Sequence, residues 1–325
     1  MLTARAAPAV VGESAPIVAM CRRLDAIARA ERTTLITGPT GTGKDVVAQA
    51  LHGRSRRNTE PFVVVHCAAL PETLVEAELF GHSRGAFTGA TQARDGLVRT
   101  AEQGTLFLDE IDSLSLGAQA KLLRFLETGE FRPVGADHTE RSSAWVVAAT
   151  NQDLHARARH GQFREDLLYR LEVVRVAIPP LRERLGDIPQ LIEHFLGQLG
   201  LAHKRLSPAA RIALDHHAWP GNVRELRHRI EAAAVLGDAD VIELEDLGLD
   251  PAPPPLAELL DAGGLGLESE LWRLVADQGM SLAQATSACE DILVRAALRH
   301  EGHNRTRAAA RLGINVRTIY KKLPR

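Results

Sequence analysis

The stretch GPTGTGKD, from Gly38 to Asp45, decides the fold of this chain. The apolar run Thr33–Thr37 precedes it and the helical pattern Val46–His52 follows it. Glycines let successive backbone N–H groups turn toward phosphate oxygens, a helix start favours negative charge, and a lysine at position 44 can reach the β- and γ-phosphates. The spacing matches the phosphate-binding loop G-x-x-x-x-G-K, and a glycine-rich turn without a ligand is the alternative. The expected nucleotide-binding residues are Gly38, Pro39, Thr40, Gly41, Thr42, Gly43, Lys44 and Asp45.

A second apolar run, Thr105–Leu108, leads into two carboxylates, Asp109 and Glu110. Beside a phosphate-binding loop, one such carboxylate holds Mg²⁺ and another orients the attacking water. We therefore expect Asp109 to bind the metal and Glu110 to be catalytic, together with Lys44. Asp45 occupies the position where Ser or Thr usually contacts the magnesium ion. The combination predicts a nucleoside triphosphatase that uses Mg²⁺.

The length and composition of the chain limit its class. Its 325 residues are enough for about two or three domains. With 45% hydrophobic and 25% charged residues, the chain is typical of a soluble globular protein and too apolar for a disordered one. No apolar run approaches the ~18–20 residues that span a bilayer, so we expect no membrane partner. Three widely spaced cysteines, without a CxxC pair, argue against a zinc site or a disulfide framework and favour the reducing cytoplasm.

The order of patterns along the chain predicts an α/β domain followed by helical segments. Short β-branched runs alternate with helical patterns, which is typical of a parallel sheet covered on both faces. The candidate strands are Thr33–Thr37, Phe62–His66, Thr105–Leu108 and Trp145–Thr150. After Pro179 the strand signals vanish up to about Leu247, and a proline-rich run at Pro251–Pro255 predicts a flexible linker. We expect an α/β nucleotide-binding subdomain over 1–178, a helical subdomain over 179–248, a linker over 249–285 and a helical domain over 286–325.

The near-zero net charge conceals an asymmetry. From Cys289 to Arg325 there are nine Lys and Arg against three Asp and Glu, a balance of +6. The rest of the chain has 30 basic and 38 acidic residues, a balance of −8. A basic end on an acidic body indicates an anionic partner for that end, although a solvated charged tail would have the same composition.

Further motifs resemble those of one bacterial family. The hexapeptide GAFTGA, Gly85–Ala90, is similar to the signature loop of the bacterial enhancer-binding proteins, the AAA+ ATPases that activate sigma-54 RNA polymerase. The resemblance covers nearly everything from Val11 to about Leu247. It continues through GTLFLDEID (Gly104–Asp112), KLLRFLETGEFRPVG (Lys121–Gly135), AATN (Ala148–Asn151), FREDLLYRL (Phe163–Leu171), PPLRER (Pro179–Arg184) and WPGNVREL (Trp219–Leu226). The resemblance implies an α/β fold: an AAA+ P-loop NTPase core with a helical lid, plus a C-terminal all-α helix-turn-helix domain.

The resemblance also assigns expected roles to residues. It makes the GAFTGA loop a surface element that contacts sigma-54 and moves with the nucleotide state, with Phe87 as its exposed apolar contact; a hairpin with a buried Phe87 is the alternative. Asn151 resembles a sensor of the γ-phosphate, although Asn also caps turns, and Arg224 resembles a second sensor on the lid. The loop residues expected to contact sigma-54 are Gly85, Ala86, Phe87, Thr88, Gly89 and Ala90.

Two arginines imply an oligomer. Arg164 and Arg170 are similar to the family's trans-acting arginines, whose guanidinium groups reach the phosphate transferred in a neighbouring subunit. Pairing within the chain, with Glu165 or Asp166, is the alternative. A trans arginine and a lid sensor together imply a homo-oligomeric ring, a hexamer in the family.

The sequence departs from the family's usual pattern in three places. His66 stands where the family usually has an Asn that holds the catalytic glutamate; a histidine can still hydrogen-bond Glu110, or the switch can become looser or pH-dependent. Ser83 and Arg84 replace a common Glu-Lys pair, and Arg99 falls where an acidic residue is common. None of these departures removes a required catalytic group. We therefore expect them to affect the coupling between ATP hydrolysis and the GAFTGA loop more than hydrolysis itself.

The C-terminus predicts a DNA reader. Three helical patterns, Glu290–His300, Arg305–Leu312 and Val316–Leu323, are separated by a break at 302–304 and by Gly313, and the segment resembles the Fis-type helix-turn-helix domain of the same family. A plain three-helix interaction domain is the alternative. The expected contacts to double-stranded DNA are Arg305, Arg317, Thr318, Tyr320, Lys321 and Lys322, and the expected core residues are Ala308, Ala309, Leu312, Ile314 and Ile319.

The sequence as a whole predicts an ATP-hydrolysing activator that binds an upstream DNA element and remodels sigma-54 RNA polymerase. A DNA-binding AAA+ regulator or a remodelling chaperone that acts without sigma-54 is the alternative. About ten residues precede the ATPase pattern, so we expect no receiver domain and control by abundance or by a regulatory protein in trans.

Overall fold

The computed structural model describes residues 9–69, 72–87, 90–237, 239–250, 282–302 and 304–322. Side chains at 72, 73, 282–285, 288, 292 and 320–322 are not described. The chain divides into two compact units, Met1–Ala252 and Pro253–Arg325. Within the described residues, no helix is long and apolar enough to cross a membrane. The predicted linker at Pro251–Pro255 lies outside the described residues.

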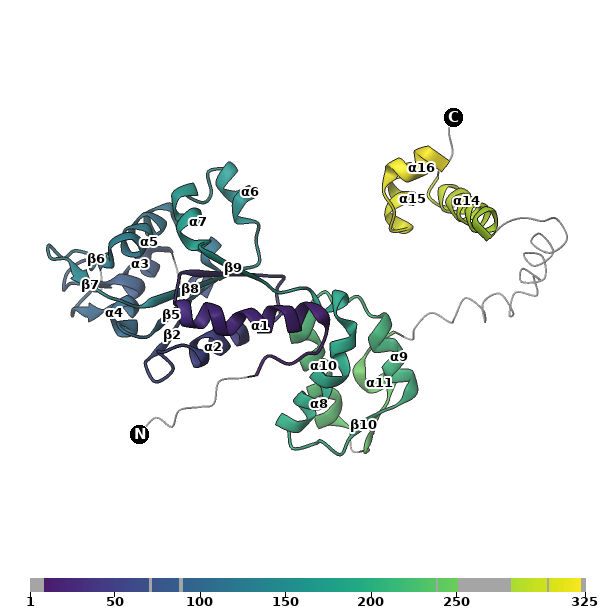
Figure 1. Cartoon of the computed structure of the whole chain (residues 1–325), viewed down its shortest axis with the longest axis horizontal. Coiled ribbons are helices and arrows are strands. Elements are labelled where there is room, and N and C mark those ends of the chain that lie inside the picture. The colour runs from purple at the N-terminus through teal and green to yellow at the C-terminus, as the bar shows by residue number, and fades with distance from the viewer. Residues whose placement is uncertain are drawn as a thin grey trace. The chain divides into compact units, whose positions relative to one another are not determined.

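The first unit is built on a five-stranded parallel sheet (Figure 1). Its strands are ordered β2-β5-β8-β1-β9. Their bounds are β1 Thr34–Thr37, β2 Phe62–His66, β5 Thr105–Asp109, β8 Trp145–Thr150 and β9 Val174–Ala177. Four of these strands confirm the predicted ones. The sequence missed β9 because only Val176 among its four residues is buried, so this edge strand lacks a continuous apolar run.

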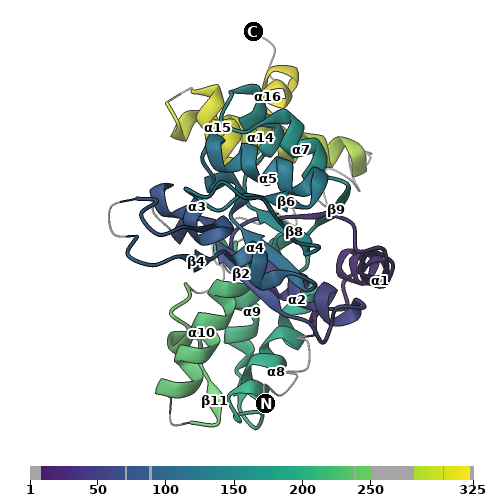
Figure 2. The ribbon, with the colours of Figure 1, turned by 90° about the vertical axis from the view of Figure 1, so that its left-hand side faces the viewer.

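Both faces of the sheet are covered by helices because alternate residues of its strands point to opposite sides. Leu106 and Leu108 of β5 pack into the core under α3 (Glu72–Phe80), α4 (Leu97–Ala101), α5 (Leu116–Thr128), α6 (Leu154–Arg159) and α7 (Glu165–Leu171). Phe107 points the other way, into the core beneath α1 (Ala15–Ala30) and α2 (Lys44–Arg54). Figure 2 shows α1 on one side of the sheet and α3 on the other. The arrangement confirms the α/β class.

Two short hairpins extend from the core. One pairs β3 (Gly81–His82) with β4 (Arg94–Asp95), and the other pairs β6 (Glu130–Phe131) with β7 (Glu140–Arg141). They touch each other, since His82 forms a parallel bridge with Val134. Single turns at η1 (Cys67–Ala69) and η2 (Ile111–Ser113) follow β2 and β5. The GAFTGA segment lies between β3 and β4.

The lid subdomain follows β9 and has its own hydrophobic core, centred on Trp219, Leu226 and Ile230. It consists of η3 (Leu181–Glu183), η4 (Leu185–Asp187), α8 (Ile188–Gln198), β10 (Arg205–Leu206), α9 (Pro208–His216), α10 (Asn222–Leu236), β11 (Val241–Ile242) and α11 (Leu244–Leu247). The expectation that no strand occurs here was wrong, because β10 and β11 form a parallel pair. Two-residue strands are too short to give a period-2 pattern.

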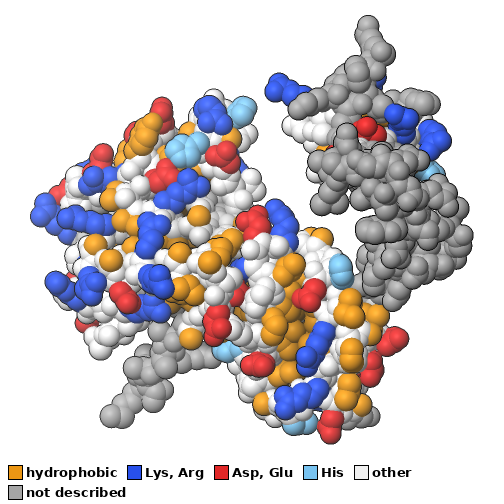
Figure 3. Space-filling view, turned by 45° about the vertical axis from the view of Figure 1, so that its right-hand side comes forward, with side chains coloured by type: hydrophobic (Ala, Val, Ile, Leu, Met, Phe, Trp, Pro, Cys, Tyr) orange, Lys and Arg blue, Asp and Glu red, His pale blue; other side chains and the backbone are white. Residues whose placement is uncertain are grey.

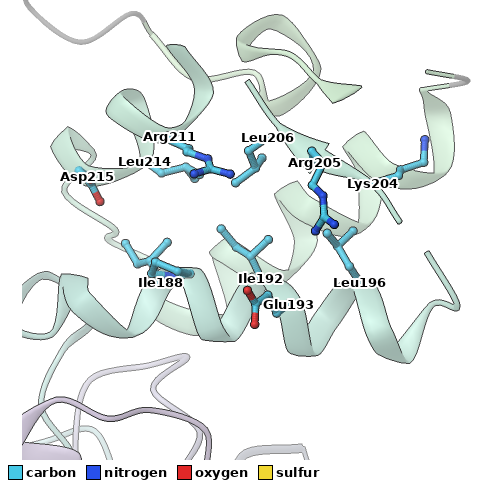
Figure 4. A pocket seen from close by; sticks show the side chains of 11 residues that line it. Ile188, Ile192, Glu193, Leu196, Lys204, Arg205, Leu206, Arg211, Leu214 and Asp215 are labelled. Atoms are coloured by element: carbon cyan, nitrogen blue, oxygen red, sulfur yellow. The ribbon is translucent and has the colours of Figure 1, made fainter. Parts of the chain in front are cut away.

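The surface of the lid combines apolar and basic side chains (Figure 3). Ile212, Val235 and Leu236 are exposed. A cavity of about 240 Å³ lies between α8, β10 and α9, with Ile192, Leu196 and Leu206 among its apolar lining (Figure 4). None of the residues that the sequence assigned to a site lines this cavity, so it is not the candidate nucleotide site.

The second unit contains the three described helices α14 (Leu282–His300), α15 (Arg305–Arg311) and α16 (Val316–Lys322). Its core confirms the predicted residues: Ala308, Ala309 and Ile319 are buried, and Leu312 and Ile314 pack against them. The first helix begins eight residues before the predicted start at Glu290. Small and polar residues such as Ala283, Gln284 and Thr286 do not form an apolar face, so the periodicity did not reveal this first part of the helix.

Candidate nucleotide-binding site

The phosphate loop joins the end of β1 to the start of α2. Gly41 and Gly43 have φ values of 79° and 94°, in the left-handed region that glycine adopts without strain. A Cβ atom at Gly41 would overlap the carbonyl oxygen of Gly221 in the lid. Glycine is therefore required at position 41 both by the backbone turn and by the close approach of the lid.

Lys44 begins α2 and folds back over the loop. Its ammonium group donates hydrogen bonds to the carbonyl oxygens of Gly38, at 2.9 Å, and Pro39, at 3.2 Å. Burial lowers the pKa of Lys44, while Asp109 and Glu110 act in the opposite direction. The lysine therefore lies between the loop and the two carboxylates, where a cation is needed beside phosphate groups.

The two predicted carboxylates follow one another at the end of β5. Asp109 is its last residue, and Glu110 has a left-handed φ of 53° as the chain turns into η2. The sequence allowed a contact of His66 with Glu110, and the structure places His66 Nδ1 3.4 Å from Oδ2 of the adjacent Asp109. The physical reason is the register of the sheet, which pairs His66 of β2 directly with Asp109 of β5.

A third carboxylate that the sequence did not single out supports this region. Asp112 is buried and accepts a hydrogen bond of 2.6 Å from the hydroxyl of Thr150. Arg157 lies 3.6 Å from its other oxygen. Asp112 therefore joins the turn after Glu110 to the end of β8. The sequence signal for this role was an acidic residue two positions after Glu110.

Asn151 lies directly after β8 and reaches the phosphate loop. Its side-chain nitrogen donates a hydrogen bond of 2.7 Å to the hydroxyl of Thr40. Arg224 approaches the same loop from the lid, where its backbone N–H donates to Gly41 O at 3.1 Å. The charge of Arg224 also contributes to the lowered pKa of Lys44. Both predicted sensor residues thus lie beside the loop.

Hollows lie on both sides of the phosphate loop. One, of about 220 Å³, is bounded by Val10 and Val11 of the N-terminal segment, by Thr42 and Gly43 of the loop and by the lid. Further apolar lining comes from Ile17, Val46, Ile178, Leu191, Phe195 and Val223. The other, of about 520 Å³, adjoins Gly38, Pro39 and Asn151. An apolar hollow next to a phosphate loop suits the flat base of a nucleotide.

The donor set also fits the metal that such a nucleotide carries. Among the described residues, no group of three His, Cys, Asp or Glu side chains could hold a metal ion alone. Mg²⁺ is usually bound through one or two carboxylates together with water and substrate phosphates. The single carboxylate of Asp109 beside the loop matches that pattern.

The two candidate trans arginines lie on or next to α7. Arg164 forms two hydrogen bonds with Asp166, of 3.0 and 2.7 Å, which is the intrachain pairing that the sequence left open. Arg170 donates to the carbonyl oxygen of Leu126 at 3.3 and 3.2 Å. In the described part of the chain, both guanidinium groups therefore contact groups outside the chain's own phosphate loop.

The described residues of the GAFTGA segment, 85–87 and 90, are hydrogen-bonded to one another. Gly85 N–H donates to Ala90 O at 2.8 Å, and Ala90 N–H donates to Phe87 O at 3.0 Å. Phe87 is half-buried, with its ring centroid 5.0 Å from that of His82, so it lies between the two sequence alternatives of an exposed and a buried side chain. Ala86 packs against the turn at Gly135 in the other hairpin. Thr88 and Gly89 lie outside the described residues.

The remaining departures from the family pattern flank this hairpin. Arg84 is exposed at its base. Arg99 pairs within the chain, at 3.1 Å from Asp95 and 3.3 Å from Glu140. Arg99 therefore ties α4 to both hairpins.

The predicted DNA-contacting residues fall on α15 and α16. Asn315 caps α16 by accepting a hydrogen bond of 2.9 Å from Arg317 N–H. Arg317 is exposed, and Thr318 and Arg305 are partly exposed. The side chains of Tyr320, Lys321 and Lys322 lie outside the described residues. The turn between the two helices passes through Gly313, whose φ is 65°.

Three family models match consecutive segments of the chain. The sigma-54 interaction domain matches residues 10–177, and the AAA+ ATPase lid domain matches residues 182–253. The bacterial regulatory protein family named Fis matches residues 288–325. The three matches cover the sheet domain, the lid and the C-terminal helices.

Individual relatives agree with the family models. The chain is 42% identical to the nitric oxide reductase transcription regulator NorR2 of Cupriavidus necator, over 96% of the chain and 62% of that protein. It is 46% identical to the Nif-specific regulatory protein of Azotobacter vinelandii, over 80% of the chain and 51% of that protein. The regulatory protein AtoC of Escherichia coli K12 is 40% identical, over 97% of the chain and 67% of that protein. The chain thus spans about half to two thirds of the length of these relatives.

A solved structure has the same architecture. The crystal structure of NtrX from Brucella abortus in complex with ATP matches 97% of the chain and 69% of its own length, with a TM-score of 0.70 and 30% sequence identity. Fold, site geometry, family models and relatives agree. The chain therefore belongs to the family of sigma-54-dependent AAA+ transcription regulators with a Fis-type helix-turn-helix.

Proposed function

We propose that this protein is an ATP-hydrolysing transcription activator, which binds an upstream DNA element and converts sigma-54 RNA polymerase from the closed to the open promoter complex. The observation that carries the proposal is the position of GAFTGA at the tip of a hairpin on an AAA+ core. None of its described residues lines either hollow beside the phosphate loop. Its presence favours sigma-54 as the partner over another polymerase form or a chaperone substrate.

The nucleotide site supports the ATPase part of the proposal. The N–H groups from Gly38 to Asp45 and the ammonium group of Lys44 would hold the phosphates, and the apolar hollow at Val10 and Val11 would hold the base. Asp109 would bind Mg²⁺, and Glu110 would orient the attacking water and accept its proton. ATP supplies a phosphoanhydride bond whose hydrolysis releases the free energy for remodelling.

A short path connects this site to the hairpin. His66, beside Asp109, ends β2, and η1 and α3 lead from there directly to β3. The core of α3 is fixed by Val75, Leu79 and Phe80, which are buried against the sheet. Because α3 packs as a rigid element, a displacement at His66 would reach Gly81 and the loop with little loss. We propose this path as the link between hydrolysis and loop movement.

The other partners follow from the remaining surfaces. We propose that Arg305, Arg317, Thr318, Tyr320, Lys321 and Lys322 contact double-stranded DNA in the cytoplasm. Arg164 and Arg170 would serve the site of a neighbouring subunit in a homo-oligomeric ring, for which we propose six subunits. Control by a regulatory protein in trans stays a prediction, and constitutive activity of the purified chain would contradict it.

Reconstituted transcription tests the proposal. The purified chain, ATP and a supercoiled template that carries its binding site are combined with core polymerase, either with sigma-54 or with the major sigma factor. We expect open complexes only with sigma-54 and only with hydrolysable ATP. Activation with the major sigma factor would favour a sigma-54-independent regulator. ATP hydrolysis without activation of either polymerase would favour a remodelling chaperone.

A further inference from the structure

The lid is hydrogen-bonded to three consecutive carbonyl groups of the phosphate loop. Asn222 Nδ2 donates to Thr40 O at 2.8 Å. The backbone N–H of Arg224 donates to Gly41 O at 3.1 Å. Arg184 Nη2 donates to Thr42 O at 3.2 Å. With the bonds from Lys44 to Gly38 and Pro39, every carbonyl from Gly38 to Thr42 accepts a hydrogen bond.

Both the oxygen and the nitrogen of the Asn222 side-chain amide form hydrogen bonds at the boundary between the lid and the phosphate loop. Its side chain is 2% exposed, and its oxygen accepts a hydrogen bond of 2.9 Å from Leu181 N–H. Its backbone φ is 53°, a conformation that Asn tolerates better than most residues. The nitrogen of the amide is therefore directed at Thr40 by contacts within the lid.

Arg184 is buried to a similar degree, with 4% exposure, and lies 4.0 Å from the buried carboxylate of Asp187. Asp187 in turn accepts hydrogen bonds of 2.7 Å from both the backbone N–H and the hydroxyl of Ser14, at the start of α1. The guanidinium group thus joins the phosphate loop to the lid and, through Asp187, to the N-terminal helix.

These contacts determine which way the loop's N–H groups face. In a trans peptide the carbonyl of one residue and the N–H of the next point in opposite directions. A lid that holds the carbonyls of Thr40, Gly41 and Thr42 therefore turns the N–H groups of Gly41, Thr42 and Gly43 away from the lid contacts. A phosphate loop needs its N–H groups oriented together in this way.

We propose that Asn222 and Arg184 are positioning residues, which orient the phosphate loop for the nucleotide phosphates and make phosphate binding depend on the position of the lid. The inference rests on the proposed function as an ATPase, since it concerns the same loop. Neither residue needs to touch the nucleotide for this role. Arg224 contributes through its backbone, so a side-chain substitution there does not report on the contact.

The substitution Asn222→Asp tests the inference. Asp keeps the oxygen that accepts from Leu181 and tolerates the same φ, but it places a carboxylate oxygen against Thr40 O. In the full-length chain, competition with a fluorescent ADP analogue should show a Kd for ADP raised by about tenfold, as expected for one lost hydrogen bond. The Kd for adenosine should change by less than about twofold, because adenosine carries no phosphate for the loop to bind.

Asn58→Asp, at an exposed position, is the charge-matched control and should leave both affinities unchanged. Equal weakening of ADP and adenosine, or of neither, would overturn the inference. If Asn222→Asp lowers the melting temperature of the free chain, Asn222→Gly, which retains the φ without adding charge, should still weaken ADP binding selectively. Failure of the unsubstituted chain to bind ADP would instead sink the proposed function, and the inference with it.

Discussion

At the scale of single residues, Glu110, the proposed catalytic carboxylate, has an unusual backbone conformation. Its left-handed φ of 53° is a conformation that costs a non-glycine residue about 1–3 kcal/mol. The turn persists because Ile111 and Asp112 are buried just after it. The charge of Glu110 also acts on Lys44, where it raises the pKa of the ammonium group against the lowering effect of burial.

We predict that Glu110→Gln abolishes hydrolysis and retains nucleotide binding. Glutamine has the same size but cannot accept the proton of the attacking water, so ATP turnover should fall by at least about 100-fold. The Kd for ADP should change little, because the phosphate loop is untouched. Turnover is measured by phosphate release and binding by fluorescence anisotropy.

The matched control is Glu127→Gln, at an exposed position on α5. It removes the same charge and should leave turnover at the level of the unsubstituted chain. Appreciable hydrolysis by Glu110→Gln would remove Glu110 from the catalytic role and leave Asp112 or Asp109 to be tested.

The residues of the phosphate loop could be predicted from the sequence because they are contiguous and their spacing is specific. Asn222 and Arg184 could not, because they contact loop residues 182 and 142 positions away. No local pattern encodes such a contact. The neighbour of His66 could not be predicted either. Only the register of β2 and β5 reveals that His66 lies beside Asp109.

At the scale of elements, the hairpin between β3 and β4 carries the GAFTGA sequence on which the proposed function rests. Its tip is held closed by the two hydrogen bonds between Gly85, Phe87 and Ala90. Phe87 packs on His82 rather than extending freely into solvent. A contact of Phe87 with another protein would therefore have to release its ring from His82.

We predict that Phe87→Ala uncouples hydrolysis from activation. The ATPase rate should stay within about twofold of the unsubstituted chain, while open-complex formation should fall by about tenfold or more, as for an aromatic anchor at a protein interface. Phosphate release and permanganate footprinting of the promoter measure the two quantities on one sample.

Leu236→Ala, which truncates an apolar side chain that is 83% exposed on the lid, is the control and should affect neither quantity. If Phe87→Ala activated transcription normally, the hairpin would not be the coupling element. A parallel loss of hydrolysis would indicate that the substitution disturbs the core through His82.

The elements with long, regular patterns were predicted well and the short ones were not. The strands β1, β5 and β8 are apolar because they lie inside the sheet, and β2 could be predicted from its apolar run although it lies at one edge. The other edge strand, β9, has no such run, and β10 and β11 have only two residues each. The hairpins β3–β4 and β6–β7 are equally short. Such pairs are stabilised by neighbouring loops, as His82 and Val134 show, and not by their own sequence.

At the scale of the whole molecule, the guanidinium groups of Arg164 and Arg170 raise the question of how many chains build one site. Arg170 is exposed and Arg164 is partly exposed, and their hydrogen bonds in the described structure go to Leu126 and Asp166. Arg164 and Asp166 form an exposed ion pair, which contributes little to stability and is readily exchanged for another anion. A guanidinium held in this way is available for a phosphate of a neighbouring subunit.

We predict that two inactive variants restore hydrolysis when they are mixed. Glu110→Gln lacks the catalytic carboxylate, and Arg164→Ala lacks the proposed trans arginine, so each alone should hydrolyse little ATP. In random mixed rings, about a quarter of the sites would combine an intact Glu110 with a neighbour's intact Arg164, and turnover should recover in proportion. Mixing Glu110→Gln with the double variant Glu110→Gln/Arg164→Ala is the control and should recover nothing. If Arg164 served the site of its own chain, neither mixture would recover hydrolysis, because no single chain would hold both Glu110 and Arg164. That result would contradict the proposal that neighbouring subunits of a ring share one catalytic site.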